Sequence, residues 1–266
     1  MRLFRVYRSG DSGAEVAYLQ RSLPWWCWGS PSSSEADGQF GGKTAAAVKV
    51  FQSSEDLSQD GVAGEDTLRR LGVWSDVVAG IDVSSYQTVD WSAVSRDEFT
   101  CVWAKASEGA TYRDPRFVSH VRGARGAGMA VGAYHFAKLN HEPWDEAENF
   151  LGQLELAGSM DLPCVLDYEE DANTDTTHWL LCFLRQMREE TGSTPVLYTG
   201  AWRLRALSGP VGRLSEFRYW IPGWGAQPGF YGPFSNWDAW QWTNKGVVSG
   251  VAGNVDRNWL EVGLLA

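Results

Sequence analysis

The sequence has little positive charge and no long hydrophobic run. It carries 23 lysine and arginine residues against 33 aspartate and glutamate residues, for a formal net charge of -10 over 266 residues. The dense basic surface that phosphate backbones require is missing, so we expect no nucleic-acid partner. No stretch is long enough to span a bilayer, and no apolar core of signal-peptide length follows the basic residues near the N-terminus. We therefore expect neither membrane insertion nor a signal peptide.

Patterns typical of disulfide scaffolds, metal sites and nucleophilic hydrolases are also missing. The four cysteines lie far apart without a C-x-x-C pair, and are Cys27, Cys101, Cys164 and Cys182. Buried thiols are therefore favoured over disulfides. The four histidines show no H-E-x-x-H spacing, and no G-x-S-x-G turn occurs. The sequence thus predicts no metal and no other cofactor.

Tryptophan, in contrast, is abundant. The chain has 15 tryptophans, many of them beside glycine, proline, asparagine or serine rather than inside apolar runs. Sugar rings offer C–H faces that stack on aromatic side chains, so a saccharide groove would use such residues. Packing in the core and at interfaces is the alternative use, and it accounts for a good part of them.

A motif of the form D-G-x-x-G-x-x-T occurs twice, at residues 37–44 and 60–67. Its Asp-Gly pair and second glycine suit a tight turn, and its acidic or threonine residues suit the start of a helix. Apolar residues at helical spacing follow each copy, and the same spacing precedes the first copy at Val16, Leu19 and Leu23. The pattern predicts a small three-helix all-α domain over residues 1–75.

Three segments of this domain resemble the peptidoglycan-binding domain found at the ends of many cell-wall hydrolases: "GDSGAEVAYLQRSL", "DGQFGGKTAAAVKVFQ" and "DGVAGEDTLRRL". The sequence departs from that family in "PWWCWGSPSSSEA", which contains Trp25, Trp26 and Trp28. These tryptophans could add a ligand contact or pack as a lid against the second domain. The lid is favoured, because three adjacent exposed aromatics would form an apolar patch.

The second domain, residues 79–266, alternates strand-like and helix-like segments. We expect strands at residues 77–84, 99–106, 130–137, 162–169, 195–199, 218–221, 238–242 and 251–256, and helices at residues 114–126, 143–157 and 176–191. This alternation favours an α/β fold with a parallel sheet, closed as an irregular TIM-like barrel with a helix-poor second half. An open doubly wound sheet is the alternative, but "GIDVSSYQ" provides no Gly-rich phosphate loop after the first strand.

The segment "LDYEED" places four acids directly after an apolar, strand-like run. Because residues i and i+2 of a strand share a face, Asp167 and Glu169 should project together while Tyr168 turns away. At a Cα separation of roughly 6 to 7 Å, one carboxylate raises the proton affinity of the other. Such a pair can supply a general acid at neutral pH, although a solvated or cation-paired strand edge is the commoner use of this motif.

Two further acids are predicted at strand ends: Asp82 at the end of the first strand and Asp256 at the end of the last. In a closed barrel these strands are neighbours, so both acids should reach the mouth that the Asp167 strand also faces. A ring of acids suits a cationic transition state such as that of glycoside cleavage. An oxygen-only Mg or Ca site is the competing interpretation, and it leaves the tryptophans unexplained.

Five motifs in this order resemble glycoside hydrolase family 25, the muramidases called Chalaropsis-type lysozymes: "AGIDVSSYQTVDW", "VWAKASEGATYRDPRF", "GMAVGAYHFAK", "LPCVLDYEED" and "PVLYTG". The resemblance implies a barrel of eight strands and about five helices. It also implies hydrolysis of the β-1,4 bond between N-acetylmuramic acid and N-acetylglucosamine in peptidoglycan.

The same resemblance implies roles for individual residues. Glu169 would protonate the leaving oxygen, and Asp167 would hold either the acetamido group or the forming cation. Asp82 and Asp256 would be supporting acids at the mouth. Residues implied in substrate binding are Tyr134, Tyr198, Tyr86, Trp240 and Gln241. The chain departs from the family at "YWIPGWGAQPGFYGPF" and at "SSYQ", which leaves the subsite shape there open.

Other polar residues in these motifs have structural interpretations that we favour. Lys105 and Glu108 are expected to pair with each other, and His135 is expected to be a hydrogen-bonded core histidine. Glu170 points away from the acidic pair by alternation and receives no role. Asp171 and Asp175 are expected in the loop and at the start of the following helix.

Together these features predict a monomeric muramidase that its N-terminal domain holds on peptidoglycan glycan strands. A wall-binding protein with an inactive barrel is the alternative, and an amidase or peptidase is a distant third. A covalent nucleophile and acetamido assistance both remain open. Without a signal peptide, a wall-directed enzyme suggests a phage-type endolysin made in the host cytoplasm. A secreted bacterial enzyme whose signal has been removed is the rival interpretation, against which a start at Met1 speaks.

Overall fold

The structure is a computed structural model that describes residues 3, 5–29, 36–74, 76–94, 98–171, 175–224 and 231–265. The chain divides into two compact units, Met1–Val77 and Val78–Ala266, which are described separately. Among the described residues, no helix has the length and apolar character needed to cross a membrane.

The first unit contains three helices, as predicted: α1 (Ala14–Ser22), α2 (Gly42–Ser54) and α3 (Glu65–Arg70). Trp25–Trp28 form a turn of 3-10 helix. The helices enclose a small apolar core that contains Val16, Leu19, Leu23, Phe40, Val48, Phe51 and Leu68. Trp25 and Trp26 are exposed, and Trp26 stacks on Phe51 at a centroid distance of 6.4 Å. The lid predicted for these tryptophans stays a prediction.

A buried glutamine on α1 explains the first copy of the repeat. The Gln20 Nε2 group donates hydrogen bonds to Asp37 Oδ1 at 2.9 Å, to the Gln39 carbonyl at 3.0 Å and to Thr44 Oγ1 at 2.9 Å. In return, the Gly38 N–H donates to Gln20 Oε1 at 2.9 Å. Gly38 has φ 73°, the left-handed conformation expected of this tight turn. The motif therefore fastens a turn to the helix that precedes it.

The second copy repeats this arrangement around Gln52 on α2. Its Nε2 group donates to Asp60 Oδ1 at 2.8 Å, to the Val62 carbonyl at 2.9 Å and to Thr67 Oγ1 at 3.1 Å, and the Gly61 N–H donates to Gln52 Oε1 at 3.0 Å. The threonine of each copy thus serves this network, while glycine residues occupy the N-cap positions of α2 and α3. In each copy, the same set of hydrogen bonds therefore joins the turn to the helix before it and to the helix after it.

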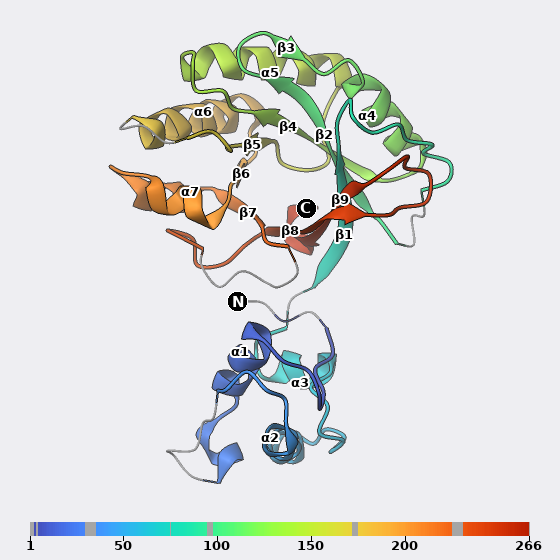
Figure 1. The fold of residues 1–266 in the computed structure, drawn as a ribbon, viewed down its shortest axis with the longest axis vertical. Coiled ribbons are helices and arrows are strands. Elements are labelled where there is room, and N and C mark those ends of the chain that lie inside the picture. Colours follow the sequence, from blue (N-terminus) through green and yellow to red (C-terminus); the bar gives the residue numbers. More distant parts are fainter. Residues whose placement is uncertain are drawn as a thin grey trace. The chain divides into compact units, whose positions relative to one another are not determined.

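The second unit is a closed barrel of eight strands, which confirms the predicted fold (Figure 1). The strands are β1 (Val77–Val83), β2 (Cys101–Glu108), β4 (Ala130–Phe136), β5 (Val165–Asp167), β6 (Val196–Tyr198), β7 (Arg218–Pro222), β8 (Ala239–Gly246) and β9 (Val255–Glu261). Pairing of β1 with both β2 and β9 closes the ring, and the short β3 (Tyr112–Arg113) joins β2 outside it.

Helices cover one side of the barrel: α4 (Phe117–Gly126), α5 (Pro143–Ala157), α6 (Thr176–Thr191) and the short α7 (Ala201–Ala206). Figure 1 shows them outside β2, β4, β5 and β6. The bounds of α5 and α6 match the sequence prediction. The side formed by β8, β9 and β1 carries no long helix among the described residues, as the helix-poor second half predicted.

The prediction for the last strand was wrong in its position. β9 runs over Val255–Glu261 rather than 251–256, so Asp256 lies near its start and not at its end. The reason is that β9 pairs antiparallel with β8, with Gly246 opposite Val255. The start of β9 therefore lies beside the carboxyl end of β8, at the same edge of the barrel as the ends of the parallel strands. Asp256 therefore lies at the predicted mouth, although β9 runs in the direction opposite to the other strands of the barrel.

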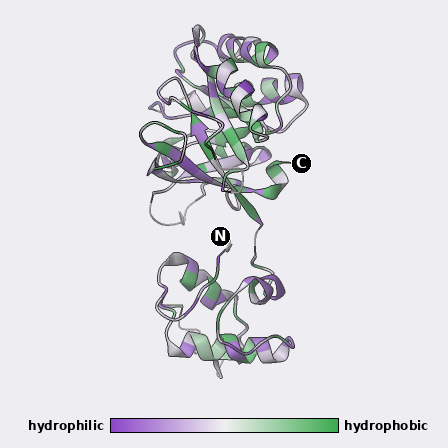
Figure 2. Ribbon diagram, turned by 90° about the vertical axis from the view of Figure 1, so that its right-hand side faces the viewer, coloured by the Kyte–Doolittle hydropathy of each residue, from purple (hydrophilic) through white to green (hydrophobic). Residues whose placement is uncertain are grey.

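Large aromatic side chains fill the barrel interior. Trp103 stacks on Trp220 with ring centroids 4.4 Å apart, and its indole N–H donates to the Pro163 carbonyl at 3.1 Å. A Cβ atom at Gly132 would lie 2.3 Å from the Trp103 ring, so glycine leaves the space for this indole. Hydrophobic residues follow the strands in Figure 2, in keeping with a filled interior. The interior is thus closed beneath the mouth.

Candidate active site

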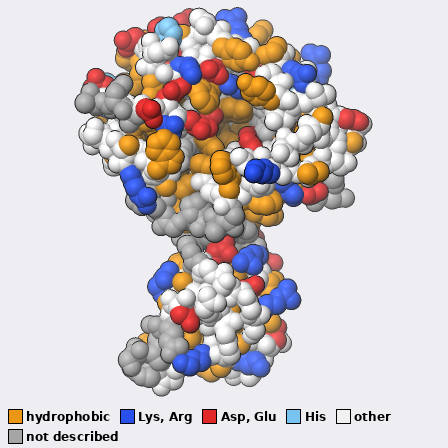
Figure 3. Space-filling view, in the orientation of Figure 1, with side chains coloured by type: hydrophobic (Ala, Val, Ile, Leu, Met, Phe, Trp, Pro, Cys, Tyr) orange, Lys and Arg blue, Asp and Glu red, His pale blue; other side chains and the backbone are white. Residues whose placement is uncertain are grey.

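A cavity of about 240 Å³ lies where the barrel strands end. Its lining includes four acids, five aromatic residues and one lysine, namely Asp82, Asp167, Glu169, Asp256, Tyr86, Tyr134, Phe136, Tyr198, Trp220 and Lys105. Figure 3 shows a hollow on the barrel unit with acidic side chains inside it and hydrophobic side chains around it. All four acids predicted from the sequence therefore lie together.

Two of these acids share a hydrogen bond at the closing edge of the barrel. Asp82, on β1, is almost fully buried, and Asp256 approaches it from the start of β9. Burial raises the pKa of Asp82 well above its usual range, and the charge of Asp256 raises it further. Burial also raises the pKa of Asp256, while its bond to Asp82 lowers it. Burial of both carboxyl groups therefore favours their protonated forms, most strongly at Asp82.

Amide donors fix the position of Asp82. Its Oδ2 atom accepts from Asn258 Nδ2 at 2.8 Å and from Gln241 Nε2 at 3.2 Å. The Gln241 Oε1 atom accepts in turn from the Tyr198 hydroxyl at 3.0 Å, and the Asn258 Oδ1 atom accepts from the Trp220 indole at 3.1 Å. These bonds connect β1, β6, β7, β8 and β9 beneath the cavity. They set the orientation of Asp82 and of two cavity-lining aromatics.

Asp167 ends β5 at the bottom of the cavity. It is buried, and its Oδ1 atom has no hydrogen-bond partner among the described residues. Burial raises its pKa well above the usual range, the charge of Glu169 raises it further, and Lys105 lowers it. A buried carboxylate oxygen without a donor is costly, so this atom marks a position at which a ligand N–H or O–H would bond.

Glu169 stands just beyond β5, at the rim. Its side chain is exposed on one side, yet the protein around its carboxyl group removes enough water to raise the pKa. The guanidinium of Arg203 opposes this pKa shift, and the charge of Asp256 adds to it. Tyr168, between the two acids, is fully buried and does not line the cavity, as alternation predicted. Glu169 is therefore the acid best placed to exchange a proton with a ligand.

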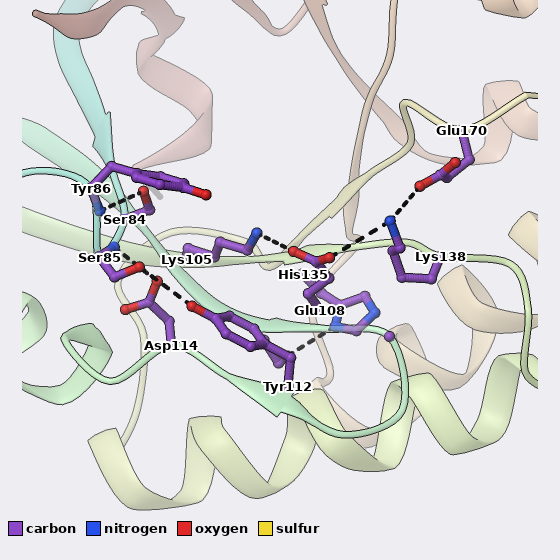
Figure 4. Close-up of polar contacts among 12 residues, drawn as sticks. Ser84, Ser85, Tyr86, Lys105, Glu108, Tyr112, Asp114, His135, Lys138 and Glu170 are labelled. Atoms are coloured by element: carbon purple, nitrogen blue, oxygen red, sulfur yellow. Dashed lines mark hydrogen bonds and ion pairs between the residues drawn. The ribbon is translucent and has the colours of Figure 1, made fainter.

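Three tyrosines surround the acids. Burial raises the pKa of Tyr134 and of Tyr198, and the nearby carboxylates raise both pKa values further, so both phenols stay protonated donors. Tyr86 lies at the rim with 89% of its surface exposed. Its loop is held because the Ser85 N–H donates to Asp114 Oδ2 at 2.8 Å (Figure 4).

A chain of ion pairs borders the cavity. Lys105 Nζ lies 2.6 Å from Glu108 Oε2, and Lys138 Nζ lies 3.7 Å from Glu108 Oε1 and 2.7 Å from Glu170 Oε1 (Figure 4). The predicted pairing of Lys105 with Glu108 is confirmed. Lys105 also lines the cavity, so this pair brings one cation to a site that is otherwise acidic.

Behind this border, His135 is a buried core residue, as predicted. Its Nδ1 atom lies 2.8 Å from Ser107 Oγ, and its Nε2 atom lies 3.0 Å from Glu146 Oε2. Burial lowers the pKa of His135, which favours the neutral ring. Glu146 also accepts from the N–H groups of Lys138 and Leu139. The network holds the loop after β4 and does not reach the cavity lining.

The structure places Trp240 away from the cavity, contrary to the expectation for that residue. Its indole is buried and donates to the Gly223 carbonyl at 2.7 Å, while its neighbour Gln241 faces the acids. Alternation along β8 accounts for the difference. Sequence reasoning missed Asn258 altogether, although it stands two residues after Asp256 and therefore on the same face of β9.

The described residues contain no group of three or more histidine, cysteine and acidic side chains arranged to hold a metal ion. The four cysteines are free thiols, and Cys27, Cys101 and Cys164 are buried, as predicted. Burial raises the pKa of the Cys101 and Cys164 thiols to about 12, so neither thiol is a nucleophile. The titratable groups that line the cavity are carboxyl groups, phenols and the Lys105 ammonium.

Each unit matches a family of known proteins. The family model of glycosyl hydrolases family 25 matches residues 81–251, and that of a peptidoglycan binding domain matches residues 12–71. Lysozyme M1 from Streptomyces globisporus is 32% identical over 196 residues, which cover 68% of this chain and 67% of that protein.

Two solved structures resemble the barrel unit. The bacterial lysozyme from Streptomyces coelicolor has a TM-score of 0.64 at 30% identity, and the match covers 71% of this chain and 95% of that one. The CTP1L endolysin has a TM-score of 0.64 at 25% identity, with coverage of 71% and 68%.

Proposed function

The chain belongs to family 25 of the glycosyl hydrolases, and we propose that Glu169 and Asp167 carry out its reaction. The protein is a muramidase that hydrolyses peptidoglycan, and its relatives support this activity rather than an inactive glycan-binding role. The bond cleaved is the β-1,4 bond between N-acetylmuramic acid and N-acetylglucosamine. The observation that supports the assignment best is the convergence of four acids with raised pKa values on one cavity.

Glu169 is the general acid in this proposal. Its raised pKa favours the protonated form that a general acid needs, and its place at the rim gives it access to a glycosidic oxygen. As the bond between the anomeric carbon and that oxygen breaks, the proton passes from Glu169 to the leaving sugar. Water then adds to the anomeric carbon and returns a proton to Glu169.

Asp167 binds the acetamido group of the sugar that becomes cationic. Its unpartnered Oδ1 atom can accept the acetamido N–H, and a donor there favours the ionised carboxylate. Substrate binding would thus lower the pKa of Asp167. Of the two acids Asp167 and Glu169, Glu169 would then be the one that carries a proton. This arrangement favours acetamido assistance over a covalent enzyme intermediate.

Asp82 and Asp256 support this site by position and charge. Negative charge on this pair would lie on the side of the cavity formed by β1 and β9. That charge stabilises a cationic transition state. Tyr134 and Tyr198 remain neutral donors for the sugar hydroxyl or carbonyl groups.

The N-terminal unit is a peptidoglycan-binding domain, and it holds the enzyme on peptidoglycan. We propose that the boundary between the two domains lies at residues 75–79 and that the enzyme acts as a monomer. An endolysin among the structural neighbours supports production in a host cytoplasm and delivery to the wall after the membrane opens. A secreted bacterial enzyme is the rival proposal.

Glu169→Gln tests the assignment. We expect a loss of activity of about a hundredfold or more, because a positioned general acid contributes roughly 10²–10⁴-fold. Glu170→Gln is the matched control, since Glu170 pairs with Lys138 outside the cavity. The assay counts new reducing ends and new free amines released from purified wall. Release of free amines by the native protein, or full activity of Glu169→Gln, would overturn the assignment.

A further inference from the structure

A second cavity of about 400 Å³ continues from the acidic one. Glu169 and Tyr198 line both cavities, and beyond them the second is lined by Trp202, Arg203 and Trp224, among others. A third cavity of about 450 Å³ shares Trp224 and adds Trp242. The shared residues make the three cavities neighbours, and we refer to this series, from the acids past Glu169 to the three tryptophans, as the path.

Two of these tryptophans are unusually open to solvent. Trp202 is 59% exposed and Trp224 is 62% exposed, although indole rings are normally buried. Exposed aromatics that line a cavity indicate a binding surface, and a flat apolar ring suits the C–H face of a sugar. Their continuity with the catalytic cavity identifies the occupant as the same polymer that occupies that cavity.

Contacts with neighbouring residues order the Trp202 and Trp242 rings and the backbone next to Trp224. The Arg203 guanidinium lies 4.0 Å from the Trp202 ring centroid, and the same guanidinium donates to the Glu170 carbonyl. The Gly223 carbonyl, adjacent to Trp224, accepts the Trp240 indole N–H at 2.7 Å. Arg257 lies 5.0 Å from the Trp242 ring centroid. A platform that is already ordered loses little entropy when it binds.

The position of Glu169 decides which part of the polymer this path receives. The sugar that becomes cationic must lie over Asp167 and near Asp82, in the first cavity. The broken bond lies at Glu169, which separates the first cavity from the second. The second cavity is therefore on the leaving-group side of the bond.

We propose that Trp202, Trp224 and Trp242 form an aromatic track that binds the saccharide units on the leaving-group side of the cleaved bond. The track makes the enzyme selective for strands that extend several sugars beyond that bond. This inference rests on the proposed role of Glu169, which fixes the place of the bond. It also gives a purpose to the "YWIPGWG" segment, in which Pro222 and Gly223 end β7 and place Trp224 at the path.

The test compares a long and a short substrate in the full-length protein. The long one is a peptide-free glycan oligosaccharide with several sugars beyond the cleaved bond. The short one is a disaccharide aryl glycoside that carries no sugar there. We expect Trp224→Ala to lower kcat/KM about fivefold on the long substrate, mainly through KM, because one stacking contact is worth about 1 kcal/mol. Activity on the aryl glycoside should change less than about twofold.

Trp144→Ala is the matched control, because Trp144 is 51% exposed on α5 and lines none of the three cavities of the path. It should leave both substrates unaffected. Equal losses on the two substrates, or no loss on the long one, would overturn the track.

The outcome also separates the track from the catalytic proposal. Binding of the long oligosaccharide to Glu169→Gln, with and without Trp224→Ala, measures the track without turnover. An inactive Glu169→Gln that binds equally well with either residue at position 224 would refute only the track. An active Glu169→Gln would refute the role of Glu169, whatever the binding result.

Discussion

The two units use the same polar residue types for opposite purposes. In the N-terminal unit, Asp37 and Asp60 accept backbone and glutamine N–H groups, and these bonds lower the pKa of both carboxyl groups. In the barrel, burial raises the pKa of Asp82 and Asp167, and Asp167 Oδ1 has no partner among the described residues. A carboxylate whose oxygens accept hydrogen bonds within the fold stabilises the fold. A buried carboxyl oxygen without a partner is instead free to bond to a ligand.

The glutamines differ in the same way. In the described part of the chain, the side chains of Gln20 and Gln52 form hydrogen bonds only with a turn and with the helix that follows it. Gln241 links Tyr198 to Asp82, so its bonds end at a reactive group. The polar contacts of the N-terminal unit thus stabilise its fold, and those of the barrel position groups that act on a ligand. Matched substitutions in the two units test this contrast, because one set should change stability and the other should change activity.

The largest contrast is expected between Asp167→Asn and Asp60→Asn. Asp167→Asn should reduce release of reducing ends by about a hundredfold or more, since it removes a charge that stabilises the cationic transition state. It should also raise the thermal unfolding midpoint of the barrel, because a buried charge is removed. Asp60→Asn should lower the midpoint of the N-terminal unit and leave activity on soluble glycan unchanged. Near-native turnover of Asp167→Asn would remove this residue from the mechanism.

A second contrast pairs Gln52→Leu with Gln241→Leu. Gln52→Leu should cost about 2 to 4 kcal/mol of unfolding free energy, because it leaves the Gly61 N–H and the Thr67 hydroxyl buried without their partner. Gln241→Leu should instead lower kcat about tenfold, because Asp82 and Tyr198 lose a shared positioning contact. Denaturant unfolding and glycan hydrolysis, measured on both proteins, distinguish the effects. Equal stability losses without a difference in activity would contradict the contrast.

The smallest expected effect is the dependence of each unfolding midpoint on pH. Asp37 and Asp60 have lowered pKa values, so their contribution to stability is present above the unfolded pKa of about 3.9 and is lost as pH falls below it. Asp82 and Asp167 have raised pKa values, so their ionisation costs stability at neutral pH and the cost disappears as pH falls toward about 4.

Calorimetry of the full chain between about pH 8 and pH 3 measures this difference. The barrel midpoint should gain from its acids as pH falls, while that of the N-terminal unit holds and then drops below about pH 4. Asp60→Asn identifies the N-terminal transition and should flatten its acid limb. Parallel pH curves for the two units would show that the acids do not differ in this way.

Local patterns predicted the parts of the fold that depend on neighbouring residues. The bounds of α5 and α6 follow from apolar spacing, and the alternation in "LDYEED" correctly turned Tyr168 away from the cavity. The direction of β9 could not be predicted in this way, because antiparallel closure depends on a register that only the assembled barrel sets. The error in the position of Asp256 within its strand follows from that.

The missed site residues have a similar cause. Asn258 on β9 contacts Trp220 on β7, although the two strands are not neighbours in the sheet. Trp202 on α7 and Trp224 after β7 line one cavity only once the barrel has assembled. The family resemblance implied Trp240 in substrate binding, but strand alternation places it on the other side of β8 from Gln241. Residue type identifies candidates, and chain geometry selects among them.

The glutamine networks make the N-terminal unit repetitive in structure as well as in sequence. Each D-G-x-x-G-x-x-T turn is bound by a glutamine on the helix before it. α3 reads "EDTLRR" and carries no glutamine, and no third copy of the motif follows it in the sequence. A lengthened α3 that carries a glutamine, followed by a third copy of the turn, is therefore the change that we expect to extend the unit.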